Sequence, residues 1–113
     1  MRKMTSKIRV NMRLCDKVSM IMATTNPDGT FDIEVQTTCD NVREFSKGLE
    51  SLTITDLTDK VNGKVFDRMR HCKMSANCLV PAGMISAGWV EAGMIAASNA
   101  KKNKCNEVEF VFD

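Results

Sequence analysis

The feature that most constrains this chain is an alternation of apolar and polar residues between residues 8 and 37. Such a period of two indicates β-strands with one solvent-facing side, because successive side chains of a strand point to opposite faces. The Asn-Pro-Asp-Gly sequence at residues 26–29 is a strong turn signal, since proline fixes φ and glycine allows a positive φ. The pattern predicts a three-stranded antiparallel meander, with strands near residues 8–14, 18–24 and 31–37.

After residue 39 the spacing of apolar residues changes from two to three or four, which indicates helices. Two amphipathic helices are marked by the stripes Val42, Phe45 and Leu49, and Val61, Val65, Met69 and Cys72. Asp40 is the expected N-cap of the first helix. Residues Leu79–Ser98 are expected to form the longest helix, with Pro81 in its first turn. Residues 107–112 alternate again and predict a last strand.

These elements define the fold class as α+β: a three-stranded antiparallel meander followed by helices packed on one sheet face and a C-terminal strand. A length of 113 residues fits a single domain, 1–113. A net charge of only +2 and few aromatic residues argue against a nucleic-acid partner. The basic N-terminus leads into a strand pattern, and no stretch has the sustained hydrophobicity of a membrane span. We therefore expect a cytoplasmic protein with no membrane partner.

The expected helix Leu79–Ser98 is apolar on nearly all sides and contains three glycines. Glycine costs roughly 1 kcal/mol in a helix interior relative to alanine, so three of them need a structural reason. Close packing against the sheet is one reason, and contact with a second subunit is another. Because so apolar a helix is hard to bury fully in a small domain, we expect a homo-oligomer that associates through this helix.

The five cysteines are an odd number, so they cannot all pair within one chain. In a reducing compartment they stay free, bind metal or do redox chemistry. Cys39 and Cys78 stand at expected helix entrances, where free N–H groups stabilise a thiolate and lower the pKa of the thiol. In an up-down-up meander the ends of strands one and three meet at one edge. This edge is therefore expected to gather Cys15, Cys39 and Cys78.

A metal ion at this edge would find its fourth ligand among Asp16, His71 and Cys72. The alternative is that the cysteines are inert, because free cysteine is among the most buried residue types. Core packing is the favoured interpretation for Cys72, which lies on a helix stripe, and Cys105 has no expected role. The zinc spacing Cys-x-x-Cys is absent from the sequence.

The strand order and the cysteine placement resemble the U-type iron–sulfur cluster assembly scaffolds over roughly residues 8–98. The positions that carry the resemblance are Cys15-Asp16 for that family's Cys-Gly-Asp, Thr38-Cys39 for its Gly-Cys, and Cys78 for the cysteine of its His-Cys. The resemblance implies an Fe–S cluster or zinc held by these cysteines and a protein partner in cluster transfer. The late Cys-x-Val-Pro at residues 78–81 also resembles an uncharacterised family of short proteins from methanogenic archaea and anaerobic bacteria.

The sequence leaves three functions open. The first is a metal-binding scaffold or carrier, in which Cys15, Cys39 and Cys78 hold an Fe–S cluster or zinc through soft thiolates. The second is a metal-free thiol or persulfide carrier that uses Cys39 or Cys78 as its nucleophile. The third is a non-catalytic oligomeric structural or interaction protein with inert cysteines. The sequence contains no hydrolase motif and no phosphate-binding loop, which favours a role other than enzyme.

Overall fold

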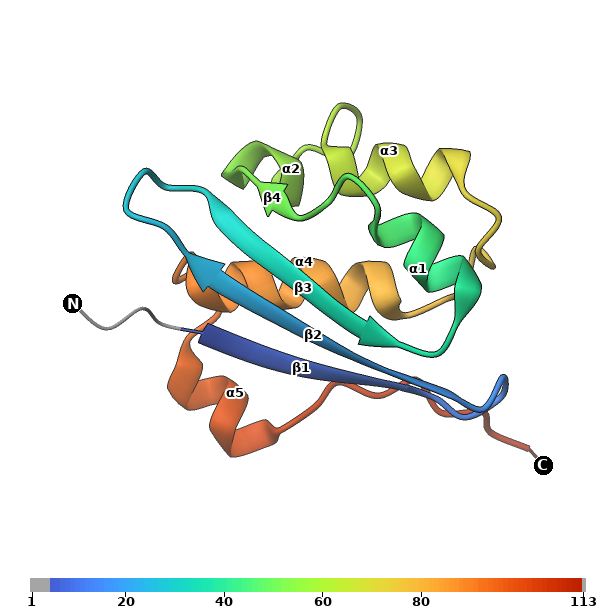
Figure 1. The fold of residues 1–113 in the computed structure, drawn as a ribbon. Helices are drawn as coiled ribbons and strands as arrows, with labels where there is room; N and C mark the ends of the chain where they lie inside the picture. Colours follow the sequence, from blue (N-terminus) through green and yellow to red (C-terminus); the bar gives the residue numbers. More distant parts are fainter. Residues whose placement is uncertain (1–4, 113) are drawn as a thin grey trace.

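Residues 5–112, which the computed structural model describes, form one antiparallel sheet with helices packed against it (Figure 1). The strands are β1 (Thr5–Met12), β2 (Lys17–Thr25), β3 (Phe31–Thr37) and β4 (Ser51–Leu52), and the helices are α1 (Asp40–Ser46), α2 (Ile54–Thr58), α3 (Lys64–His71), α4 (Val80–Glu91) and α5 (Ala97–Asn103). The sheet order is β1-β2-β3-β4, and each neighbouring pair is antiparallel. The α+β class and the antiparallel meander are therefore confirmed, although the sheet has four strands, not three.

One face of the sheet packs against the hydrophobic core, and the other face is open to solvent. On β2, Ile21 and Ala23 are fully buried, whereas Met20 and Met22 lie on the opposite face and are half-buried. The helix α4 lies along the buried face (Figure 1). Val18, Met20 and Met22 also alternate on β2, so the period of two identifies the strand, and packing against α4 selects the face with Ile21 and Ala23 as the buried one.

Two glycines let α4 approach its neighbours closely. A Cβ atom at Gly83 would lie 2.6 Å from Cγ2 of Val10 on β1, and one at Gly88 would lie 2.6 Å from Cδ1 of Leu57 on α2. Gly83 thus allows close contact with the sheet, and Gly88 allows close contact with α2. Close packing within one chain therefore explains why glycine stands at both positions. Association of two copies through this helix remains a prediction.

The helix expected over Leu79–Ser98 is in fact two helices, because α4 ends at Glu91 and α5 begins at Ala97. Gly93 has a φ of +76°, the left-handed conformation that commonly closes a helix at its C-terminus. The N–H of Met94 donates to the carbonyl of Trp89 over 2.8 Å across this closing turn. The expectation of one long helix is wrong because Gly93 ends α4 instead of lying within it.

The expected C-terminal strand is also wrong, since residues 107–112 form no strand within the described part of the chain. The side chains of Val108, Phe110 and Phe112 are 70%, 59% and 87% exposed. A strand requires a partner that accepts its backbone hydrogen bonds as well as an alternating sequence. The segment has the alternating sequence but no partner strand among the described residues.

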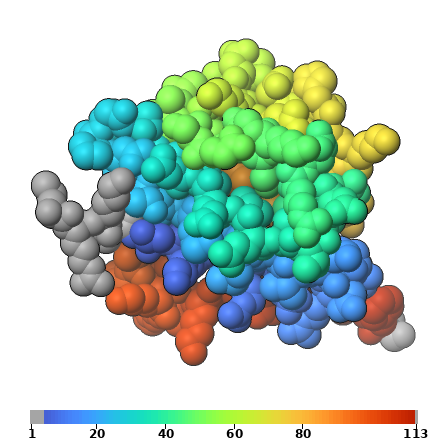
Figure 2. All heavy atoms as spheres, viewed as in Figure 1, coloured from blue at the N-terminus to red at the C-terminus, as the bar shows by residue number. Residues whose placement is uncertain are grey.

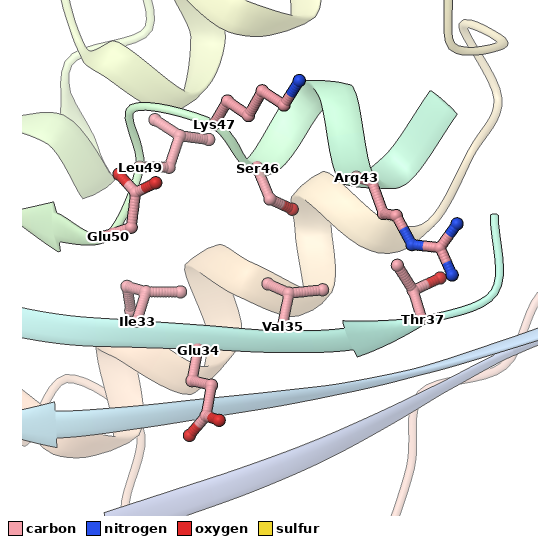
Figure 3. A pocket seen from close by; sticks show the side chains of 9 residues that line it. All are labelled: Ile33, Glu34, Val35, Thr37, Arg43, Ser46, Lys47, Leu49 and Glu50. Atoms are coloured by element: carbon pink, nitrogen blue, oxygen red, sulfur yellow. The ribbon is translucent and has the colours of Figure 1, made fainter. Parts of the chain in front are cut away.

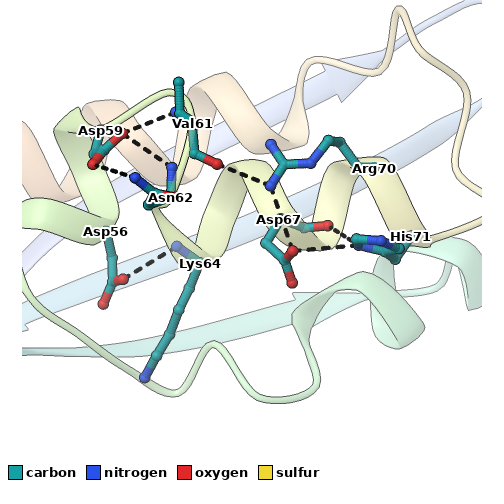
Figure 4. Close-up of polar contacts among 8 residues, drawn as sticks. All are labelled: Asp56, Asp59, Val61, Asn62, Lys64, Asp67, Arg70 and His71. Atoms are coloured by element: carbon teal, nitrogen blue, oxygen red, sulfur yellow. Dashed lines mark hydrogen bonds and ion pairs between the residues drawn. The ribbon is translucent and has the colours of Figure 1, made fainter.

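Between α1 and α3 the chain forms β4 and α2, which the apolar spacing does not predict. The buried carboxylate of Asp56 holds this region together, since it accepts hydrogen bonds from the N–H of Thr53 (2.9 Å) and the N–H of Lys64 (3.1 Å). The Asp56–Lys64 bond joins the two helices in Figure 4. Thr53 and Asp56 form a capping box, a signal that is readable in the sequence. Asp59 closes the next turn by accepting from the N–H of Asn62 (3.0 Å), which lowers the pKa of Asp59.

The ends of two helices differ slightly from expectation. The N-cap of α1 is Cys39, and Asp40 is instead the first helical residue, where it forms a 2.7 Å ion pair with Arg43. Of the predicted stripe of α3, Val65 is buried, but Val61 is 70% exposed because it precedes the helix. No helix within residues 5–112 has both the length and the hydrophobicity needed to cross a membrane.

Candidate thiol site

Three segments that are distant in sequence place cysteines at one edge of the sheet. Cys15 lies in the turn between β1 and β2, Cys39 follows the end of β3, and Cys78 precedes the start of α4. β1 and β3 run in the same direction, because both pair antiparallel with β2. Their ends therefore lie at one edge, on the right in Figure 1, where α4 also begins. We refer to Cys15, Cys39 and Cys78 as the thiol edge.

The ionisation of Cys78 is affected by the other two thiols. Burial raises the pKa of Cys78 above its usual value of 9.0, a backbone hydrogen bond from Val80 acts in the opposite direction, and negative charge on Cys39 and Cys15 raises it further. The three sulfur atoms are thus close enough to interact electrostatically. The lowered pKa expected for Cys78 at a helix entrance is wrong, because burial and the neighbouring thiols outweigh the helix amide.

Cys39 is positioned by the end of β3. The hydroxyl of Thr37 accepts a hydrogen bond from the N–H of Cys39 (3.1 Å), and it shares a 2.8 Å hydrogen bond with the hydroxyl of Ser19. Ser19 is the cross-strand partner of Thr37 on β2 and is only 2% exposed. These contacts connect the backbone of Cys39 to the centre of the sheet. Nothing in the sequence singles out Ser19 and Thr37 for this role, apart from their place in the strand pattern.

Cys15 is held less firmly than Cys39. It is exposed, its thiol lies 3.7 Å from the carbonyl oxygen of Met12, and the next residue, Asp16, has a φ of +56°. Among residues 5–112, no three histidine, cysteine or acidic side chains are arranged to hold one metal ion together. Three thiols beside a carboxylate are a donor set that suits a soft ion. The sulfur atoms would have to move closer together to share it.

The other two ligand candidates, His71 and Cys72, lie at the end of α3. The Nδ1 atom of His71 is 2.8 Å from the carbonyl oxygen of Asp67 one turn earlier, and the side chain is 65% exposed (Figure 4). Cys72 is half-buried against the core, as its place on the helix stripe suggests. Both residues line an open hollow of about 450 Å³, together with Asn41, Glu44, Arg68 and Lys73. Their own contacts are with α3 and with the core.

A second hollow, of about 290 Å³, lies between β3 and α1, and atoms coloured as α4 are visible at its bottom in Figure 2. Its lining, drawn in Figure 3, consists of Ile33, Glu34, Val35, Thr37, Arg43, Ser46, Lys47, Leu49 and Glu50. The hollow lies beside the part of β3 that has no neighbouring strand among the described residues, because β4 pairs only with Phe31 and Asp32. Its two cations are in ion pairs with acidic residues of α1, so it adds no reactive group to the thiol edge.

Comparison with known proteins gives one relationship. Residues 6–104 match DUF6951, which is described as a family of unknown function. No curated protein and no solved structure matches the chain. The resemblance to the U-type iron–sulfur scaffolds therefore stays a prediction. Because the matched region extends from the start of β1 past the end of α5, this chain belongs to the DUF6951 family.

Proposed function

We propose that this protein binds zinc or an iron–sulfur cluster through the thiolates of Cys15, Cys39 and Cys78 and acts as a scaffold or carrier. The observation that carries the proposal is that the turn after β1, the end of β3 and the start of α4 lie at one edge of the sheet, where Cys39 and Cys15 also affect the ionisation of Cys78. Such an effect requires the three thiols to share one small region, although they are far apart in the sequence. Thiolate sulfur is the donor that selects zinc and iron–sulfur clusters over hard cations such as magnesium.

The electrostatics of the thiol edge favour a cation. Burial and negative charge on Cys39 and Cys15 make the proton of Cys78 harder to remove. A cation among the sulfur atoms reverses this effect, because it attracts every thiolate at once. The raised pKa of Cys78 keeps its thiol protonated in the absence of a cation, and metal binding there releases the proton. Metal affinity is therefore expected to increase as the pH rises.

Binding requires the sulfur atoms to move closer together, and the movement falls on the loops that carry Cys15 and Cys78. Zinc–sulfur bonds of about 2.3 Å place the sulfur atoms of one site about 4 Å apart. Cys15 is in an exposed turn and Cys78 is in the segment before α4, so both can shift without unpacking the sheet. Cys39, joined to Thr37 and through it to Ser19, is the fixed member. Asp16 stands next to Cys15 and is the nearest oxygen donor in sequence for a fourth position.

A metal-free thiol or persulfide carrier is less well supported. Such a protein needs a thiolate near neutral pH, because the thiolate is the attacking form. The pKa of Cys78 is raised, so its thiolate fraction at neutral pH is lower than that of a free cysteine. A metal-binding role does not meet this obstacle, since the cation itself lowers the pKa of the thiol.

The test uses the full chain purified anaerobically in the presence of a reductant. Elemental analysis gives the metal content, and titration with Co²⁺ reports thiolate coordination through its charge-transfer absorption. We expect Cys15→Ser, Cys39→Ser and Cys78→Ser each to weaken Co²⁺ binding by about tenfold or more. Cys105→Ser is the matched control, because Cys105 is an exposed cysteine in the segment after α5. The proposal fails if the purified protein holds no metal or sulfide and the triple variant binds Co²⁺ as well as the control does.

A further inference from the structure

The segment of residues 107–112, with the sequence EVEFVF, has exposed apolar side chains and no partner strand in the described part of the chain. It contains Phe110 and Phe112, which are the two mostly exposed phenylalanines of the described chain. Within residues 5–112, no backbone hydrogen bond joins this segment to a strand. Its alternation of glutamate and apolar residues nevertheless has the period of a β-strand with one apolar face.

The sheet offers this segment a free edge at β1. Among the strands of residues 5–112, β1 pairs only with β2, so the outer side of all eight of its residues has no neighbouring strand there. On the core face of β1, Ile8 and Met12 are only half-buried, which leaves the core incompletely covered at this edge. On the solvent face, Lys7 and Arg9 are exposed. An added strand would continue the ladder through the free N–H and C=O groups of β1.

The charges of EVEFVF match this edge. Because side chains alternate between the two faces of a sheet, a strand that turns Val108 and Phe110 toward the core face turns its glutamates toward the solvent face. There Glu107 and Glu109 would lie beside Lys7 and Arg9. Opposite charges on neighbouring strands stabilise a pair, and like charges directly opposite each other destabilise it.

The same rule excludes the other available partners. On the opposite side of the sheet, β3 has a free edge beyond its short pairing with β4, but its solvent face carries Asp32 and Glu34, which would repel the glutamates of EVEFVF. Direct pairing of β1 with β1 of a second copy would place Lys7 and Arg9 against the same cations. Pairing of EVEFVF with β1 is therefore the arrangement that places apolar side chains on the core face and glutamates beside lysine and arginine.

We propose that the EVEFVF segment of one copy of this chain pairs with the edge of β1 of a second copy, and that the exchange is reciprocal. In Figure 1 the chain after α5 runs in the same direction as β1, so pairing with its own β1 would create a parallel ladder. A two-fold axis perpendicular to the strands reverses the direction of the second copy and makes the ladder antiparallel, like every other pair in this sheet. The partner is thus a second copy, and the resulting sheet is extended at β1 in each copy.

The experiment is a charge swap followed by mixing, with the dimer dissociation constant measured by sedimentation velocity in reductant and chelator. These conditions prevent dimers that are linked by disulfides or by metal. We expect the Lys7→Glu/Arg9→Glu variant and the Glu107→Lys/Glu109→Lys variant each to dimerise at least about tenfold more weakly than the unmodified chain. In an equimolar mixture of the two variants, each segment meets a complementary edge. The mixture should therefore dimerise to within about threefold of the unmodified chain.

The mixing step distinguishes pairing between two copies from pairing of the segment with β1 of its own chain. If both variants stay monomeric when mixed, or if the unmodified chain is a monomer at high micromolar concentration, the proposal is overturned. It is also overturned if Phe110→Ser/Phe112→Ser dimerises as well as the unmodified chain, a result that would place the contact elsewhere, for example on α4. Glu34→Lys, a charge reversal on β3, is the control and is expected to leave dimerisation unchanged. Circular dichroism of each variant verifies the fold.

Discussion

The two ends of α4 are held in different ways. At its C-terminal end, the indole N–H of Trp89 donates to the carbonyl of Leu57 (2.8 Å), and the carboxylate of Glu91 accepts from the hydroxyl of Ser6 (2.6 Å) and the N–H of Thr25 (3.1 Å). These contacts connect α4 to α2, β1 and β2. At its N-terminal end no side chain caps the helix, and the preceding residues include Cys78 of the thiol edge.

The difference shows where stability and chemistry are located in this chain. The C-terminal end of α4 has its polar groups paired and its backbone in close contact with Leu57. The N-terminal end follows Cys78, whose ionised form is disfavoured by burial and by negative charge on Cys39 and Cys15, with Cys15 in an exposed turn. Regions that bind or react are commonly the less firmly held parts of a fold. Changes at the two ends should therefore have separable effects on unfolding and on metal binding.

The largest effect is expected from Leu57→Ala at the C-terminal end. Leu57 is fully buried and fills the space beside Gly88, so its truncation leaves a cavity. We expect the free energy of unfolding to fall by about 2–5 kcal/mol, measured by urea denaturation. The matched control is Leu14→Ala in the turn beside Cys15, where the side chain is 76% exposed and the expected change is within about 0.5 kcal/mol. Equal losses for the two leucines would contradict the comparison.

Glu91→Ala should have the next largest effect. The substitution leaves the N–H of Thr25 and the hydroxyl of Ser6 without their acceptor in a partly buried site, at a cost of about 1–3 kcal/mol. Glu91→Gln keeps one oxygen and should lose less than Glu91→Ala. Amide hydrogen exchange at Thr25 is the local measurement, and its protection should decrease in Glu91→Ala. Unchanged protection there would show that Glu91 does not hold the ends of the strands.

A smaller effect is expected from the alkaline titration of Cys78. Because its pKa is higher in the folded chain than in an unfolded one, the folded state retains the proton over a pH range in which the unfolded state has lost it. The stability that this proton provides is present below about pH 9 and is lost as the pH rises through the folded-state pKa. The free energy of unfolding should thus decline less steeply above pH 9 in Cys78→Ala than in the unmodified chain, measured in reductant and chelator. Parallel pH profiles would contradict the raised pKa.

The smallest effect on stability is expected from Cys15→Ser. Cys15 is exposed and its thiol bonds to the backbone carbonyl of Met12 in its own turn, so the free energy of unfolding should change by less than about 0.5 kcal/mol. Thermal unfolding of the metal-free protein measures this directly. In combination with weakened Co²⁺ binding, such a result would separate the function of the thiol edge from the stability of the fold. A large loss of stability would instead assign Cys15 a structural role.

The helical half of the chain shows why local patterns predict some elements and miss others. The stripe that contains Val42 and Phe45 identified α1, because an amphipathic helix repeats its apolar face every three to four residues. The region of β4 and α2 has no such repeat, since it is organised by the buried carboxylate of Asp56 and the capping box with Thr53. The capping box can be read from the sequence. The bond from Asp56 to the first turn of α3 cannot, because it depends on how two helices meet.

The candidate site also has one feature that the sequence predicts and one that it does not. The order of strands predicts that residues after β1 and β3 lie at one edge, so the nearness of Cys15 and Cys39 follows from topology. The raised pKa of Cys78 does not follow from its position before a helix, since the degree of burial decides between a lowered and a raised value. Burial depends on the packing of the whole domain.

Local patterns predict the meander and the edge of the sheet where Cys15 and Cys39 lie. These predictions depend on periods of two and four and on turn residues, which act over a few positions. Packing of the whole domain sets which face of β2 is buried, ends α4 at Gly93, buries Asp56 and leaves EVEFVF without a partner within the described residues. Each of these depends on which distant groups fill the space beside a residue. The same alternation forms a strand on β3 and stays exposed at residues 107–112, because a strand needs both a pattern and a neighbour.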